Sequence, residues 1–352
     1  MTRDRLLDPR SRATRFRRLR VVPAAGLAVA LVLGACQPAG TSSGPSGGAS
    51  SFPAASASAA GGTTQLSIAT GGTGGVYYPL GGGFSQVIRK YIPGYDATVQ
   101  ETNASVDNMQ LIGGGGADLA LVLGDTAADA VEGRGEFESG PVEACTLGRL
   151  YDNFTQVVTS SDTGITSIED LRGKRVSLGS TGSGTEVIGL RILEAAGIDP
   201  DTDIERQQLA VDETVNGLRD GTVDAGFWSG GLPTAALTEY ATTGKLVVIP
   251  TAEYTEKVAA THGPFYLSAE IPPDTYSGQT AAVPTIVVPN VLVVNTSMPE
   301  ELQRQITEAI YGHKDELVAV HPAANALDAS TAGDVEFMDV CPGARAYFDT
   351  QG

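Results

Sequence analysis

The sequence predicts an α/β protein built from two similar lobes, and three observations support this. The first is a glycine-rich loop in LSIATGGTGGVYY (residues 66–78), which follows a short apolar segment typical of a strand and leads into a helix beginning near Val76 or Tyr77. The second is the same strand, loop and helix order in RVSLGSTGSGTE (residues 175–186), with a helix starting near Thr185. The third is the alternation of strands and helices from residue 64 on, which is typical of an open sheet covered by helices.

The two glycine-rich loops predict sites for an anion. Glycine permits positive φ angles and lets a ligand approach backbone N–H groups closely. The start of the following helix adds unpaired N–H groups and a partial positive charge, which suit a carboxylate or phosphate. We therefore expect one anion-binding loop in each lobe, with the two loops facing each other across a cleft.

The remaining elements follow in a regular order. After the first loop we expect a helix over 81–91, a strand over 96–101, a helix from Val106 to Ile112 and a buried strand over 117–123. Further on, the expected strands are 150–160, 176–178, 204–209, 223–228, 244–250 and 291–295, and the expected helices are 186–196, 212–218, 299–311 and a short one in the tail. The stretches SVDNMQLIGGGGADLALVLGDTAADA and TVNGLRDGTVDAGFWSGGLPTAA share a helix, a glycine break, an aspartate, an apolar strand and a polar turn. We interpret them as an internal repeat.

The first residues are typical of a secretory signal. Eight arginines precede the apolar run VVPAAGLAVALVLGA, which is too short to span a membrane. Leu33-Gly34-Ala35-Cys36 resembles the bacterial lipobox, so we expect a lipoprotein signal peptide over 1–35 and lipidation of Cys36; the alternative is an ordinary signal peptide. Residues 36–63, mostly Gly, Ala, Ser, Pro and Thr, predict a flexible tether.

Charge and cysteine content limit the possible partners. Without residues 1–35 the net charge is about −24, and the sequence has no basic stripe that could neutralise the phosphates of a nucleic acid. We therefore expect no nucleic-acid partner. Cys145 and Cys341 then remain as an even pair, which favours a disulfide outside the cytoplasm; two buried free thiols are the alternative. No Cys/His spacing indicates a metal site, and we expect no cofactor.

The sequence gives little support to an enzyme. The single Gly-x-Ser-x-Gly pattern, at 44–48, lies in the predicted tether, where no strained nucleophile turn can form. His262, His313 and His321 lack matching Ser/Asp or metal spacing, so we expect surface or core roles for them and no catalytic residues. The first loop also lacks the Gly-Lys-Ser/Thr ending of a phosphate-binding loop and does not fit a dinucleotide fingerprint.

Six stretches together resemble the TAXI family (TRAP-associated extracytoplasmic immunogenic proteins), the solute-binding proteins of a class of TRAP transporters. They are IATGGTGGVYYPLG, ETNASVDNMQLI, GKRVSLGSTGSGTEV, DAGFWSGGLPTAAL, IPPDTYSGQ with VPTIVVPNVLVVN, and PGARAYF. They cover nearly all of the chain after residue 64, in the family's order. The family commonly has a histidine before the final Pro-Gly-Ala, where this chain has Cys341, and this difference adds to the case for the disulfide.

The resemblance implies a type II periplasmic-binding-protein fold, in which two α/β lobes joined by a hinge close on a ligand in the cleft between them. It places lobe 1 at 64–157 and 287–352, and lobe 2 at 158–286. Known members bind glutamate, glutamine or related small organic acids and deliver them to a membrane permease driven by an ion gradient. By this resemblance the chain is a monomeric, lipid-anchored receptor on the extracytoplasmic face of the cell membrane.

Eleven residues are candidates for ligand contact. They are Gly72, Thr73, Gly74 and Tyr77 at the first loop, Asn103 and Ser105 before the next helix, Ser180, Ser183, Gly184 and Thr185 at the second loop, and Trp228 at the end of a strand. Asn103, Ser105 and Thr185 have an alternative role as helix caps, and Tyr77 and Trp228 can form the cleft wall. Two alternative functions remain open: a surface lipoprotein that signals solute occupancy to a receptor, and a secreted hydrolase.

Overall fold

The computed structural model of the protein describes residues 62–351. The predicted signal peptide, the lipidation site Cys36 and nearly all of the tether lie outside these residues. Within 62–351, no helix combines the length and the apolar character that crossing a membrane requires.

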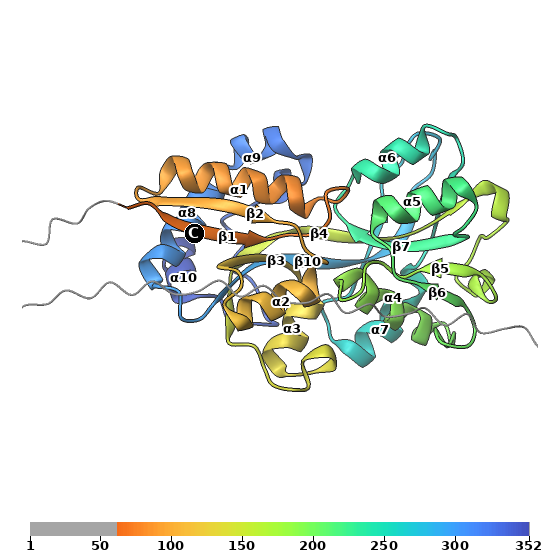
Figure 1. The fold of residues 1–352 in the computed structure, drawn as a ribbon, viewed down its shortest axis with the longest axis horizontal. Coiled ribbons are helices and arrows are strands. Elements are labelled where there is room, and N and C mark those ends of the chain that lie inside the picture. Colours follow the sequence, from red (N-terminus) through yellow and green to blue (C-terminus); the bar gives the residue numbers. More distant parts are fainter. Residues whose placement is uncertain (1–61, 352) are drawn as a thin grey trace, which may run out of the picture. The chain divides into compact units, whose positions relative to one another are not determined.

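The described chain alternates strands and helices (Figure 1). The strands are β1 (Thr64–Ala69), β2 (Tyr95–Gln100), β3 (Leu119–Leu123), β4 (Ala144–Ser160), β5 (Arg175–Ser177), β6 (Glu205–Gln207), β7 (Ala225–Gly230), β8 (Leu246–Ile249), β9 (Leu267–Ile271) and β10 (Val283–Asn295). The helices are α1 (Tyr77–Tyr91), α2 (Ser105–Gly114), α3 (Gly124–Glu132), α4 (Gly184–Ala195), α5 (Val211–Asp220), α6 (Ala235–Ala241), α7 (Thr255–His262), α8 (Glu300–Gly312), α9 (Lys314–Val320) and α10 (Pro342–Phe348).

The sheet topology shows the same arrangement twice. The strand order is β2-β1-β3-β10-β4-β7-β5-β6, with β8 beside β4 and β9 beside β10. In the first half, β1 pairs in parallel with β2 and β3, and β10 runs antiparallel to β3. In the second half, β5 pairs in parallel with β6 and β7, and β4 runs antiparallel to β7. The order β2-β1-β3-β10 thus matches β6-β5-β7-β4, and the internal repeat predicted from the sequence is confirmed.

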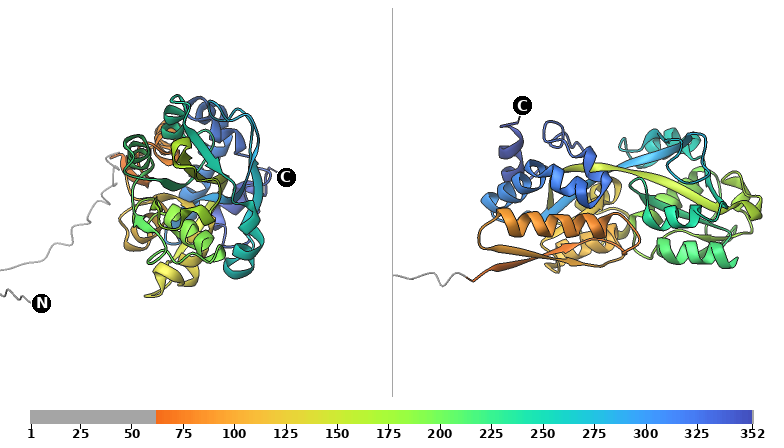
Figure 2. Two further views of the ribbon diagram at one scale, coloured as in Figure 1. Left: turned by 90° about the vertical axis from the view of Figure 1, so that its right-hand side faces the viewer. Right: turned by 90° about the horizontal axis from the view of Figure 1, so that it is seen from above.

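The long strands β4 and β10 join the two halves. Here the first half means β1–β3, α1–α3 and α8–α10, and the second half means β5–β9 and α4–α7. Figures 1 and 2 show β4 and β10 running from one half into the other, and the two strands pair with each other over most of their length.

Each half has helices on both faces of its strands. In the first half, α1 and α9 lie on one face and α2 and α3 on the other (Figure 1). The core beneath α1 includes Ile68, Leu80 and Phe84, all fully buried. The opposite core, beneath α2, includes Met109 and Ile112. In the second half, α4 and α7 cover one face and α5 and α6 the other. This layering leaves the carboxyl ends of β1, β3, β5 and β7 directed at the junction of the halves.

Some predicted elements need correction. The stretch GDTAADAVE after β3 was expected to be a polar turn, but it forms α3, because its alanines favour a helix and Asp125 stabilises the first turn. The strand expected at 150–160 begins earlier, at Ala144, since its first residues pair with the end of β10. Helices α6, α7 and α9 and strand β9 were not predicted.

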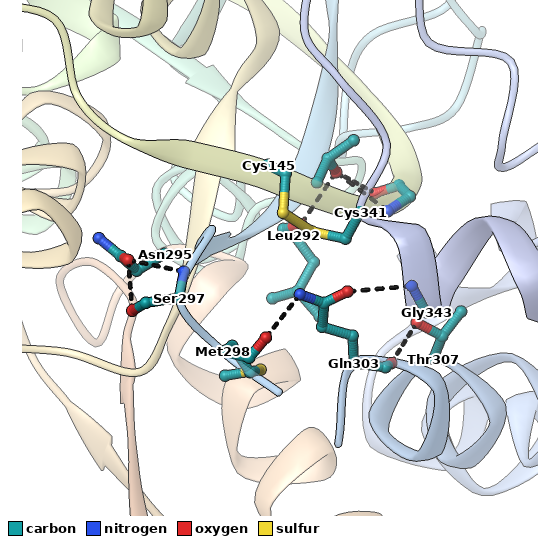
Figure 3. The surroundings of a disulfide bond; sticks show 11 residues. Cys145, Leu292, Asn295, Ser297, Met298, Gln303, Thr307, Cys341 and Gly343 are labelled. Carbon is teal, nitrogen blue, oxygen red and sulfur yellow. Dashed lines mark hydrogen bonds between the residues drawn. A yellow bond between two sulfur atoms is a disulfide. The ribbon is translucent and has the colours of Figure 1, made fainter. Parts of the chain in front are cut away.

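The structure joins Cys145 to Cys341 by a disulfide, which links β4 to the residue before α10 (Figure 3). The surrounding side chains connect the same elements. Gln303 of α8 accepts a hydrogen bond from the Gly343 N–H (3.0 Å) and donates one to the Met298 carbonyl (2.8 Å). The carboxyl-terminal helix is therefore fixed to the first half by covalent and polar contacts.

Candidate ligand-binding site

A small cavity, about 40 Å³ in volume, lies where the two halves meet. It is bounded by the loops before α1 and α4, by the starts of α2 and α5, and by β4 and β7. Nine of the eleven predicted residues line it: Gly72, Tyr77, Asn103, Ser105, Ser180, Ser183, Gly184, Thr185 and Trp228. The two glycine-rich loops therefore do face one space, although they are distant in sequence.

Thr73 and Gly74 do not line this cavity. Thr73 is exposed, and Gly74 packs against the start of α5, where an added Cβ would lie 3.3 Å from the Val211 and Asp212 side chains. These two residues form the outer side of the first loop. The contact of Gly74 with α5 connects the two halves beside the cavity.

The first loop leads into a helix whose start has no side-chain cap. Helix α1 begins at Tyr77, so the N–H groups of its first turn have no acceptor within the helix. The Tyr77 ring is buried in the cavity wall, and its hydroxyl donates to the Asn290 carboxamide oxygen of β10. Burial raises the pKa of Tyr77, so the hydroxyl stays protonated and acts as a donor. The Tyr77 hydroxyl proton is thus donated to Asn290 within the protein and not to a ligand.

Ser183, in the second loop, caps the start of helix α4. The alternative role that we gave Thr185, as this cap, is wrong. The Ser183 hydroxyl accepts a hydrogen bond from the Glu186 N–H (3.0 Å), and α4 begins at Gly184. The Thr185 hydroxyl instead accepts from the Ser229 N–H of β7 (3.2 Å), which ties α4 to the strand beneath it. Gly184 must be glycine, because a Cβ there would lie 2.8 Å from the Ser105 hydroxyl oxygen.

The expectation that Asn103 or Ser105 caps α2 is also wrong. The residue before α2 is Ala104, with φ 75°, and no side chain caps the helix. The Ser105 hydroxyl accepts from the Leu123 N–H of β3 (3.1 Å). The N–H groups of Val106 and Asp107 both donate to the Gly182 carbonyl of the second loop (3.2 Å each). A backbone contact between the halves therefore replaces the local cap.

Trp228 forms one wall of the cavity from β7. Its ring is half-buried, and its Nε1–H donates to the Thr234 hydroxyl (2.9 Å). This bond fixes the plane of the indole. The ring lines the cavity and lies against Gly75 of the first loop.

The cavity lining is almost uncharged. Among the residues of 62–351 that line it, Asp212 at the start of α5 is the one with a charged side chain, and none is a lysine, arginine or histidine. Four helices, α1, α2, α4 and α5, begin at the cavity, and their N-termini supply partial positive charge there. The site thus offers an anion N–H and hydroxyl groups in place of a cationic side chain.

Several lining residues were missed by the sequence analysis, notably Tyr151 and Asn153 on β4, Ser229 on β7 and Asp212 on α5. Tyr151 and Asn153 are two residues apart in a strand, so they lie on the same face. Polar side chains at alternate positions of a strand buried in a sheet are the signal that could have identified them.

The histidines lie elsewhere. His262 contacts Glu194 (3.3 Å), His313 stacks on Tyr91, and the His321 ring accepts from the Ala323 N–H (3.1 Å). All three therefore have contacts away from the cavity.

This architecture is the type II periplasmic-binding-protein fold. MatC from Rhodopseudomonas palustris, solved with bound malate, superposes with a TM-score of 0.54 at 11% identity, covering 81% of this chain and 96% of that one. PhnD1 from Prochlorococcus marinus, in complex with methylphosphonate, gives a TM-score of 0.52 at 12% identity, covering 75% of this chain and 91% of that one. At these identities the likeness establishes the fold, and the predicted fold class is confirmed.

The family model of the NMT1-like family matches residues 68–352. The chain therefore belongs to the NMT1-like family.

Proposed function

We propose that the protein is an extracytoplasmic solute-binding receptor that captures a small carboxylate, such as glutamate, glutamine or a related acid, for a TRAP-type secondary transporter. The observation that carries this proposal is the convergence of four helix N-termini on one small cavity between the halves. A carboxylate in such a cavity receives charge-assisted hydrogen bonds that the surrounding protein shields from water.

The proposal assigns the two halves as lobes, with lobe 1 at 64–157 and 287–352 and lobe 2 at 158–286. Strands β4 and β10, which join the halves, act as the hinge, and ligand entry and release require the lobes to separate. The contact between Gly182 and the start of α2 belongs to the closed form.

The class of ligand and the TRAP-type partner rest on different grounds. MatC and PhnD1 were solved with malate and methylphosphonate, which are small anions, and this agrees with a site made of helix N-termini. The partner permease rests on the resemblance of the six sequence stretches to the TAXI family. The lipid anchor at Cys36 keeps the receptor beside such a permease, and Cys36→Ser should release it from membranes.

The direct test is a thermal-shift screen of the purified full-length chain against amino acids, dicarboxylates, keto acids and sugars, with calorimetry on each hit. A ligand at a hundredfold excess over its Kd adds about 2.7 kcal/mol to stability. A co-purified ligand that masks the site is detected by mass spectrometry after unfolding. Stabilisation by sugars and by no acid, with no acid co-purified, contradicts the proposal.

The site assignment has its own test. Ser183→Ala and Tyr77→Phe should each weaken binding of the best acid, because one variant loosens the α4 N-terminus and the other the cavity wall. The matched control for Ser183→Ala is Ser160→Ala, which removes a similar cap from a short helix away from the cavity. Unchanged affinity in both cavity variants would mean that the acid binds elsewhere.

A further inference from the structure

Three polar groups at the cavity have no hydrogen-bond partner among the described residues. They are the Tyr151 hydroxyl, the Asn153 carboxamide oxygen and the Ser229 hydroxyl. Tyr151, Asn153 and Ser229 are 4%, 2% and 5% exposed, and all three line the cavity. A buried polar group without a partner costs about 1–3 kcal/mol. Three such groups around one cavity indicate that a polar ligand completes their hydrogen bonds.

The three groups differ in what they require from a ligand. The Asn153 Nδ2 donates to the Ser229 carbonyl (3.4 Å), so its free atom is the oxygen, which can only accept. The Tyr151 and Ser229 hydroxyls can both donate and accept. Burial raises the pKa of Tyr151 well above its ordinary value, so that hydroxyl remains protonated. A ligand must therefore carry at least one hydrogen-bond donor, which the Asn153 oxygen accepts.

The same cavity also presents hydrogen-bond donors to a ligand. The first turns of α1 and α4 present N–H donors, which suit the acceptor oxygens of a carboxylate. Asp212 adds a second acceptor at the start of α5. The cavity thus presents donors and acceptors within one small space, and a ligand that satisfies both carries a carboxylate and, close to it, an N–H or O–H group.

We propose, building on the function proposed above, that Tyr151, Asn153 and Ser229 select acids that carry a hydroxyl or amino group beside the carboxylate. An acid of equal size without that group leaves the Asn153 oxygen unpaired in the closed cavity. The preference therefore comes as much from the cost of leaving the Asn153 oxygen unpaired by one acid as from the hydrogen bond that the other acid makes to it.

The test compares matched pairs of acids on the full-length chain by calorimetry. L-malate and succinate differ by one hydroxyl, and L-glutamate and glutarate differ by one amino group. In at least one pair, the acid with the donor should bind about 10- to 100-fold more tightly, which corresponds to the cost of one unpaired buried group.

Variants then assign the preference to the three residues. Asn153→Leu should reduce the ratio of the two affinities to near one, whereas Asn153→Asp, which keeps the accepting oxygen, should retain a preference. Tyr151→Phe and Ser229→Ala should weaken the tighter-binding acid while leaving the melting temperature of the free protein unchanged or raised, because each removes an unpaired hydroxyl. The matched control is Tyr240→Phe, since the Tyr240 hydroxyl is also buried and unpaired but does not line the cavity.

Asp212→Asn separates the two kinds of donor. A carboxylate partner matters more for a charged ammonium than for a neutral hydroxyl, so this variant should weaken glutamate binding more than malate binding if an amino group is selected. Equal loss for both acids, or loss for neither, assigns the selection to a hydroxyl read by the other three residues.

The outcomes distinguish this inference from the function on which it rests. If acids bind but the acids of each pair bind equally, or if Asn153→Leu keeps the full preference, the inference is wrong and the receptor function stands. If no acid binds and none co-purifies, the receptor function for carboxylates is wrong, and this inference falls with it.

Discussion

Gly75 lies directly against the indole ring of Trp228, so that a Cβ atom at position 75 would be 2.8 Å from Trp228 Cη2. Gly75 belongs to the loop before α1, and Trp228 belongs to β7 in the other half. The ring is fixed by its bond to Thr234 and has little freedom to move aside. The approach of the two halves at this point therefore requires a residue without a side chain.

Gly75→Ala should weaken binding of the best acid about tenfold, because the added methyl group keeps the halves apart, and overpacking of this kind costs about 1–3 kcal/mol. Calorimetry measures the change. Gly82→Ala is the matched control: it lies in α1 with open space around it, and alanine there should raise helix stability by about 0.5–1 kcal/mol without changing affinity. Equal affinity in both variants would show that this contact is absent from the ligand-bound form.

The sequence predicted the parts of the site that depend on local chemistry. Glycine loops between a strand and a helix can be recognised from residue type alone, and the loops containing Gly72 and Ser183 do meet at the cavity. The cap of α2 could not be predicted, because its N–H groups bond to the Gly182 carbonyl, which is distant in sequence. The alternating polar side chains of Tyr151 and Asn153 can be recognised in the sequence, but which face of β4 lines the cavity depends on how β4 pairs with β7 and β10.

The internal repeat extends to one pair of aspartates. Asp118 accepts from the Ser67 N–H (2.8 Å), and Asp224 accepts from the Arg175 N–H (2.9 Å), at equivalent places before β3 and β7. Asp224 also binds the Arg175 guanidinium through both oxygens (2.6 and 3.0 Å). These bonds fix the start of β5 against the turn that precedes β7.

Asp224→Asn should lower the free energy of unfolding by about 1.5–3 kcal/mol at neutral pH, the range for a hydrogen bond to a charged group. The hydrogen bond from Arg175 lowers the pKa of Asp224. A carboxyl with a lowered pKa in the folded state contributes stability above its ordinary pKa, and this contribution is lost as the pH falls through the lower value. Urea unfolding at several pH values should therefore show the difference from wild type shrinking below about pH 4.

The control for this prediction is Asp162→Asn. Asp162 pairs with Lys245 on the surface, where both side chains are more than half exposed, and its loss should have almost no effect at any pH. A constant difference between wild type and Asp224→Asn from pH 7 to pH 3 would contradict the assigned linkage.

Replacing both Cys145 and Cys341 by alanine should lower the free energy of unfolding by about 2–5 kcal/mol, as for other native disulfides. The bond joins residues 196 positions apart and so restricts a long loop of the unfolded chain. Thermal unfolding with and without reductant measures the effect. Reductant should lower the melting temperature of wild type towards that of the double variant and leave the variant unchanged. Two free thiols in non-reduced peptides would rule out the bond.

Arg191 of α4 forms a buried charge cluster with α3 of the other half. Its guanidinium bonds to Asp129 and the Tyr266 hydroxyl and lies 3.5 Å from Asp125. The Asp125 side chain is fully buried and accepts a hydrogen bond from the Tyr266 hydroxyl (2.7 Å). Desolvation raises the pKa of Asp125, and the positive charge of Arg191 opposes this rise.

Arg191→Met should destabilise the protein by about 3–5 kcal/mol, because it leaves Asp125 as a buried charge without an ion-pair partner. Loss of the Arg191 charge raises the pKa of Asp125 further. A carboxyl with a raised pKa in the folded state binds more protons there than in the unfolded state. Stability therefore falls as the pH rises from the pKa of the unfolded state to that of the folded state. The deficit relative to wild type should therefore grow from pH 5 to pH 8 in urea unfolding.

Two further variants test the role of charge. Adding Asp125→Asn to Arg191→Met should recover much of the loss of stability at pH 8. The control Arg219→Met, which breaks an exposed pair with Glu239, should cost about 0.5 kcal/mol or less. A deficit independent of pH, or no recovery in the double variant, would show that Arg191 acts through packing and not through the charge of Asp125.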